Sequence, residues 1–179
     1  MKQPSTAWLE RTAPDEEAHF ARAAKVIGAP QKNRSAKFGP GRSLHRKLLL
    51  ATTATLDVLE GPPEYARHGL FAIPGRHRAL VRLSNGGPDV QSNKTPDVRG
   101  FALKVLDVSG PAAMGGTTDH QDFLMINQDR LPTRDSREFV DFIAAATPSP
   151  LAGLLHLFKA HGANELERFA DNDILLSIN

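Results

Sequence analysis

The histidine in the stretch RSLHRK, residues 42–47, is a candidate for acid–base chemistry. His45 lies there among basic and hydroxyl side chains, directly before an apolar run. A histidine has an unperturbed pKa near ~6.5, so it can take up and return a proton close to neutral pH. The alternative is a surface or capping histidine in a basic arm, and this stretch alone leaves both interpretations open.

Composition excludes several other kinds of chemistry. The chain has 179 residues, enough for one domain with a real core. Its 22 Lys and Arg are nearly matched by 20 acids, so no broad positive field for nucleic acid is expected. The absence of cysteine excludes disulfides, thiolate metal sites and a cysteine nucleophile. Without an apolar signal or membrane-spanning run, we expect a cytoplasmic protein that binds no membrane.

The elements that must position His45 begin with a short helix. Residues 15–26 place Ala, Phe and Val at helical spacing, with acids in the first turn. Residues 28–42, GAPQKNRSAKFGPGR, contain too much Gly, Pro and charge for either period, which predicts an extended arm or loop. This arm would lead the chain to His45.

Four segments after His45 have the character of strands, namely residues 48–60, 78–87, 99–108 and 122–127. The first is rich in Leu, Thr and Val, and the second ends in an Asn-Gly turn signal. Residues 64–75 are expected to be a connector with a possible helical turn. The four strands should form an antiparallel set.

Two helices are expected after the strands. DSREFVDFIAAA and PLAGLLHLFKAHG carry apolar residues three and four apart, with Asp135 or Ser136 as a cap and Pro150 near the second start. Strands followed by helices predict an α+β fold.

Several spaced motifs resemble the N-terminal half of the haem catalase superfamily, in the same order. They are RSLHRK, VRLSNGG, DVRGFALK, QDFLMIN and RDSREFVDFI, and the resemblance covers roughly residues 38–145. It implies a catalase-like half-barrel over residues 38–134, preceded by a helix and arm over 1–37 and followed by a helical segment over 135–179. The implied cofactor is haem, and the implied substrate is hydrogen peroxide or an organic hydroperoxide.

The resemblance also implies roles for individual residues. His45 corresponds to the family's distal histidine, which accepts a proton from peroxide and returns it, and Ser84 to the serine that hydrogen-bonds its other ring nitrogen. Arg42 and Arg82 correspond to arginines that pair with haem propionates. Phe139 corresponds to a phenylalanine that packs on haem. The alternative, purely structural roles are a strand-end serine, solvated arginines and a phenylalanine buried by an amphipathic helix.

Other motif positions are expected to be structural or depart from the family pattern. Asp97 and Arg99 match the family's D-P-R, and we expect an ion pair at a strand start. The family's distal asparagine aligns with Ile126, so Asn127 takes that role only if the strand register slips or bulges.

The family's iron ligand has no match, because catalases use a late tyrosine and the only tyrosine here is Tyr65, between the first two strands. The sequence stops at Asn179 after an apolar ILL, so we expect an incomplete N-terminal portion. A complementing C-terminal chain or a homo-oligomer would then cover the open strands.

The residues bear on two other functions. A non-enzymatic remnant could keep the half-barrel as an interaction or dimerisation module, which the missing tyrosine favours and the retained His45, Ser84, Arg42 and Arg82 oppose. A metal-dependent hydrolase is a poor fit, because none of the seven histidines forms an H-x-x-x-H or H-x-H pair.

Overall fold

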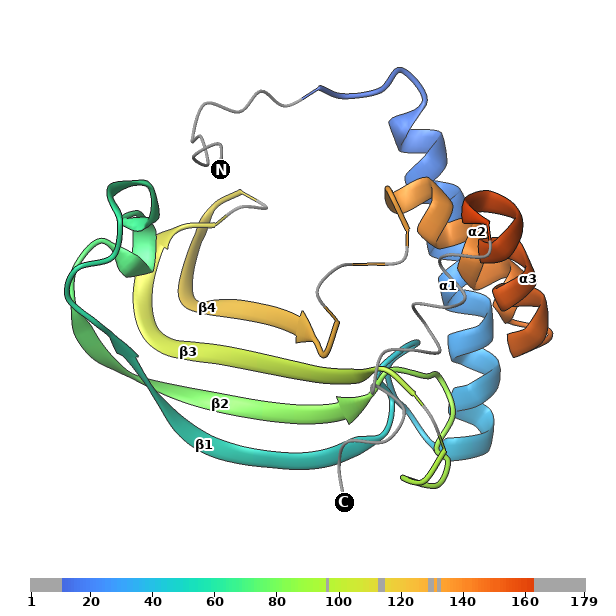
Figure 1. The fold of residues 1–179 in the computed structure, drawn as a ribbon, viewed down its shortest axis with the longest axis horizontal. Coiled ribbons are helices and arrows are strands. Elements are labelled where there is room, and N and C mark those ends of the chain that lie inside the picture. Colours follow the sequence, from blue (N-terminus) through green and yellow to red (C-terminus); the bar gives the residue numbers. More distant parts are fainter. Residues whose placement is uncertain (1–10, 96, 113–114, 129–130, 132, 163–179) are drawn as a thin grey trace. The chain divides into compact units, whose positions relative to one another are not determined.

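The computed structural model describes residues 11–95, 97–112, 115–128, 131 and 133–162. Four strands and three α-helices follow one another in the order α1, four strands, α2, α3 (Figure 1). The expected α+β class is therefore confirmed. The segment 163–179, which includes the apolar ILL, lies outside the described residues.

The sheet consists of β1 (Leu48–Val58), β2 (Gly75–Asn85), β3 (Arg99–Pro111) and β4 (Thr117–Ile126). It is antiparallel with neighbours in sequence order, and among the described residues it stays an open sheet rather than a closed barrel (Figure 1). All four predicted strands exist. Their ends differ, since β2 and β4 begin three and five residues before the predicted starts at 78 and 122.

The connector between β1 and β2 contains two 3-10 turns, where the sequence predicted at most a single helical turn. They span η1 (Glu64–Ala66) and η2 (Gly69–Phe71). Phe71 of the second turn packs against Phe123 of β4, with ring centroids 5.8 Å apart. This contact ties the connector to the far edge strand of the sheet.

The first helix, α1, spans Glu16–Phe38, so the extended arm predicted from residue 28 is wrong for most of its length. Pro30 lies inside the helix, where it removes one backbone donor. The low helix propensity of residues 28–38 is outweighed by tertiary contacts. Arg34 from this second half pairs with Asp89 at 3.0 Å.

The same half of α1 also holds the chain that follows it. The amide of Gln31 donates to the carbonyl of Gly41, and the hydroxyl of Ser43 donates to Gln31 Oε1. The guanidinium of Arg46 donates to Ser35 Oγ. The residues on either side of His45 are therefore fixed to a helix, whereas an extended arm was expected.

Helices α2 (Ser136–Ala146) and α3 (Pro150–His161) begin where their capping signals predicted. The Asp135 carboxylate accepts the backbone N–H of Glu138 at 2.9 Å, and Pro150 occupies the first turn of α3. Figure 1 shows α2 packed against both α1 and α3. In the described part of the chain, no helix is long and apolar enough to cross a membrane.

The described residues form two compact units that alternate along the sequence. One consists mainly of Leu49–Leu83 and Phe101–Met125, which hold most of the sheet. The other contains Thr12–Leu48, Ser84–Gly100 and the described residues from 126 onward. His45, the end of β2 and the start of β3 therefore belong to the unit that also contains the helices.

Each unit has a small apolar core. Val58, Ala79 and Val105 are buried in the sheet, and Val140 and Leu157 are buried among the helices. Many large apolar side chains of the strands remain exposed to solvent. The sheet thus exposes many large apolar side chains, as surfaces that bind another protein often do.

Candidate functional site

His45 is held just before β1 by its backbone. Its N–H donates to the carbonyl of Gly86 at 2.8 Å, and its φ of 50° lies in the left-handed region. Non-glycine residues adopt this conformation rarely, at a cost of about 1–2 kcal/mol, although histidine is among the more tolerant ones. Strain of this kind persists where surrounding contacts over-determine it and is concentrated at functional sites.

The His45 ring is paired with Ser84, the residue that the motif analysis put beside it. Nδ1 of His45 lies 3.1 Å from Ser84 Oγ, across 39 positions of sequence. Ser84 is only 2% exposed at the end of β2, so its hydroxyl is shielded from competing water. The hydroxyl can donate or accept, and its direction decides which ring nitrogen carries the proton.

Two glycines allow this close arrangement. A Cβ at Gly100, the second residue of β3, would lie 2.4 Å from His45 Nδ1 and 2.7 Å from Ser84 Oγ. A Cβ at Gly86 would lie 3.0 Å from the carbonyl oxygen of Val98. The Asn-Gly pair at 85–86 does not form a hairpin turn, since β3 begins only at Arg99. It forms instead a close backbone crossing beside His45.

Asn127 follows the last residue of β4 and is clamped by Arg99. Its N–H donates to the Arg99 carbonyl at 3.0 Å, and its side-chain Oδ1 accepts the Arg99 N–H at 2.7 Å. Because a backbone N–H can only donate, the oxygen assignment of this amide follows from chemistry. The amide NH₂ is therefore the group that Asn127 can offer to another molecule.

These contacts gather the predicted distal residues at one end of β3. Gly100 touches the His45 and Ser84 pair, and its neighbour Arg99 clamps Asn127. The strand alternation that cast doubt on Asn127 does not apply, because the residue lies beyond β4. The sequence does not indicate that the Asn127 side chain accepts the backbone N–H of Arg99, where a strand residue would use its carbonyl.

A polar network that the sequence analysis did not predict holds the β2–β3 connection. Asn85 is fully buried, and its Oδ1 accepts from Arg99 Nη1 at 2.8 Å. Arg99 Nη2 also donates to the carbonyl of Asn93, and Lys47 Nζ donates to Asn93 Oδ1 and the Gln91 carbonyl. The only sequence signal was a polar residue, Asn85, next to a glycine at a strand end.

The expected ion pair between Asp97 and Arg99 is wrong. Asp97 accepts the backbone N–H of Gly87 at 2.9 Å, and the Arg99 guanidinium donates to Asn85 and Asn93. A carboxylate that accepts a backbone N–H can stabilise a turn as well as an ion pair does. Each of the two residues therefore bonds to the β2–β3 connection rather than to the other.

The residues expected to contact haem are distributed along the fold. Arg42 is exposed before His45, Arg82 is half-buried in β2, and Phe139 is half-buried in the first turn of α2. Arg82 belongs to the sheet unit, whereas Arg42 and Phe139 belong to the helix-containing unit. Tyr65 lies in η1 with 42% of its surface exposed.

Helix α2 carries an electrostatic cluster of structural character. Glu138 accepts the backbone N–H of Arg134 at 2.6 Å, and the Arg134 guanidinium lies beside the same carboxylate. These contacts, with nearby His161, hold the pKa of Glu138 below its usual value against the opposing effect of burial. His161 Nε2 lies 2.7 Å from Glu138 Oε1 without the alignment of a hydrogen bond.

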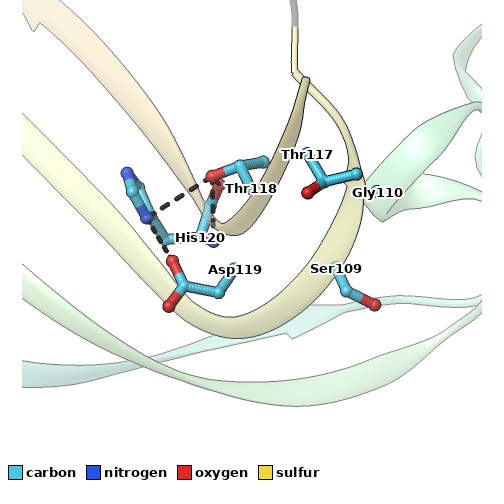
Figure 2. A pocket seen from close by; sticks show the side chains of 6 residues that line it. All are labelled: Ser109, Gly110, Thr117, Thr118, Asp119 and His120. Carbon is cyan, nitrogen blue, oxygen red and sulfur yellow. Dashed lines mark hydrogen bonds and ion pairs between the residues drawn. The ribbon is translucent and has the colours of Figure 1, made fainter.

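A concave site in the sheet unit lies near the turn between β3 and β4. Figure 2 shows Ser109 and Gly110 facing Thr117 and the stretch Thr118–His120 across an open hollow. Asp119 Oδ1 lies 2.8 Å from His120 Nδ1, and this contact lowers the pKa of Asp119. Asp119 is 95% exposed at its side chain, so the cluster is a solvated surface feature.

Within the described residues, no group of three or more His, Cys, Asp or Glu side chains could hold a metal ion. The comparisons with known proteins add no family, since no family model, curated protein or solved structure matches this chain. The function must therefore be argued from the motifs and from the geometry around His45.

Proposed function

We propose that this chain belongs to a catalase-like haem protein that acts on hydrogen peroxide or organic hydroperoxides, with His45 as acid and base. The observation that supports this most is the contact between His45 Nδ1 and Ser84 Oγ at 3.1 Å. The two residues come from motifs 39 positions apart, and the family resemblance requires them to be bonded. The contact therefore agrees with what the resemblance implies for these two side chains.

The acid–base step follows from the direction of that hydrogen bond. When Nδ1–H donates to Ser84 Oγ, the lone pair of His45 is on Nε2. Nε2 then accepts the proton of a peroxide hydroxyl and returns it to the departing oxygen atom as the O–O bond breaks. The same imidazole serves as base and then as acid, so no net proton is consumed.

Asn127 would orient the peroxide. Its Oδ1 is occupied by the Arg99 N–H at 2.7 Å, so the amide can only donate outward. A hydrogen bond from this NH₂ to a peroxide oxygen would orient the O–O bond and stabilise the negative charge that develops on it. An Asn with a rotating amide could not enforce that polarity.

The chemistry of the proposed residues suits a haem, residue by residue. His45, Ser84 and Asn127 supply the distal polar groups, Arg42 and Arg82 have the guanidinium forks that suit propionates, and Phe139 could pack on the ring. When bound, ferric haem supplies the redox chemistry of O–O cleavage. The proposal assigns no iron ligand, because Tyr65 matches none of the family's motifs.

The direct test of the acid–base role is His45→Ala in the haem-loaded protein. General acid–base catalysis contributes about 10²–10⁴-fold, so peroxide turnover should fall by at least two orders of magnitude while haem content is retained. His68→Ala is the matched control, because His68 is exposed and belongs to none of these motifs. Equal turnover in wild type and His45→Ala would end the acid–base claim.

The second candidate is a non-enzymatic catalase-like module for interaction or dimerisation. Its support is the exposed apolar surface of the sheet, to which every strand contributes. Leu50, Leu80, Phe101 and Leu124 are 50%, 44%, 40% and 85% exposed. In the described part of the chain, β1 and β4 are also open edges, which favour pairing with another chain.

The second candidate is tested by the association state of the whole chain. Sedimentation velocity should reveal a concentration-dependent dimer, and Leu124→Lys should weaken it by placing a charge on edge strand β4. Thr53→Lys, at an exposed position of the opposite edge strand β1, shows whether any added edge charge has this effect. A monomer at all concentrations would contradict the module.

A further inference from the structure

Gly100 is buried at the second position of β3, directly against the His45 and Ser84 pair. A Cβ placed there would lie 2.4 Å from His45 Nδ1, 2.7 Å from His45 Cε1 and 2.7 Å from Ser84 Oγ. Real Cβ atoms essentially never approach other atoms closer than 3.0 Å. The φ of Gly100 is not in the left-handed region, so the need for glycine at this position is one of space alone.

The three atoms that a Cβ would strike belong to the dyad itself. Two are ring atoms of His45, including the nitrogen that bonds to Ser84, and the third is the bonding oxygen of Ser84. A methyl group at this position therefore cannot be accommodated by moving a side chain other than His45 or Ser84. It must separate Nδ1 from Oγ or turn the ring.

The backbone on either side resists the alternative of moving the whole histidine. His45 N–H is bonded to the Gly86 carbonyl at 2.8 Å, and Gly86 N–H is bonded to the Val98 carbonyl at 2.6 Å. Ser84 is nearly fully buried in β2. A Cβ at Gly100 would therefore act directly on the contact between the His45 ring and Ser84 Oγ.

We propose that Gly100 is a positioning residue that keeps His45 Nδ1 on Ser84 Oγ and thereby selects the ring nitrogen that acts on substrate. The effect of Gly100 on the contact between His45 and Ser84 does not depend on haem. The claim that this contact selects the nitrogen that acts on peroxide rests on the proposed function. A merely structural glycine would affect stability without changing the histidine's tautomer. This difference makes the proposal testable without haem.

The experiment is ¹⁵N NMR of the His45 ring in the whole chain, without haem, over a pH titration. Gly100→Ala should change the tautomer balance and the titration of His45 in the same direction as Ser84→Ala does. Gly28→Ala is the matched control, because nothing lies within 4 Å of its Cβ position in α1, and it should leave the His45 signals unchanged. A folded Gly100→Ala protein with wild-type His45 signals would overturn the proposal.

A second measurement covers the case in which Gly100→Ala still shows a urea transition but is too unstable for an NMR titration. In a His45→Ala background the ring is gone, so Gly100→Ala should lower the urea midpoint by less than half of its effect in the wild type. An equal loss in both backgrounds would contradict a role through His45. A wild-type protein that never binds haem would defeat the proposed function while leaving both of these results intact.

Discussion

Asn85 is expected to hold the β2–β3 connection through one hydrogen bond to a charged partner. The side chain is fully buried, and its Oδ1 accepts from Arg99 Nη1 at 2.8 Å. A hydrogen bond to a charged group contributes about 1.5–3 kcal/mol. Asn85 Nδ2, however, has no hydrogen-bond partner within the described part of the chain, and removing an unsatisfied donor recovers about 1 kcal/mol.

The difference predicts that Asn85→Ala lowers the free energy of unfolding by about 0.5–2 kcal/mol. Asn85→Asp should lose less, because a carboxylate keeps the partner of Arg99 and removes the unsatisfied donor. Urea denaturation of the whole chain followed by circular dichroism measures both. Asn33→Ala is the control, since Asn33 is exposed on α1. A loss below about 0.5 kcal/mol for Asn85→Ala, the usual scatter of surface substitutions, would refute this reasoning.

Two further predictions concern the start of α2. Asp135→Ala removes the cap on the Glu138 N–H and should cost about 1 kcal/mol in thermal or urea unfolding, whereas Asp135→Ser should retain most of the stability. The Arg134 backbone N–H, aided by the guanidinium, lowers the pKa of Glu138 in the folded chain, so this carboxylate stabilises the fold above its unfolded pKa and loses that effect as the pH falls through its folded pKa. Glu138→Gln should therefore lower the urea midpoint at neutral pH and approach wild type in acid; a constant difference at all pH values would contradict the linkage.

The strands and the capped helices were predictable because their signals are local. Leu, Thr and Val in residues 48–58 favour a strand wherever the chain places them, and Asp135 caps the helix that follows it directly. The length of α1 was not predictable in this way. Its second half contains Pro30 and much charge, and it is held by contacts such as Arg34 with Asp89, 55 positions away.

Some features of the candidate site were predictable from local sequence, and others depend on contacts between distant segments. The pairing of His45 with Ser84 was anticipated from motif resemblance, since each motif can be read alone. The need for Gly100 was not, because the atoms that exclude a Cβ come from two other segments of the chain. The orientation of Asn127 was also hidden, because its side chain bonds to the backbone of Arg99 in a way that strand alternation does not describe.

Ferric haem titration of the purified whole chain, followed at the Soret and charge-transfer bands, shows whether this chain binds haem as proposed. We expect saturable binding of one haem per chain, weakened when Arg42 and Arg82 are both changed to Glu because the propionates then meet carboxylates. Non-saturable binding, or binding that the double charge reversal leaves unchanged, would contradict the assignment of these residues to a haem site.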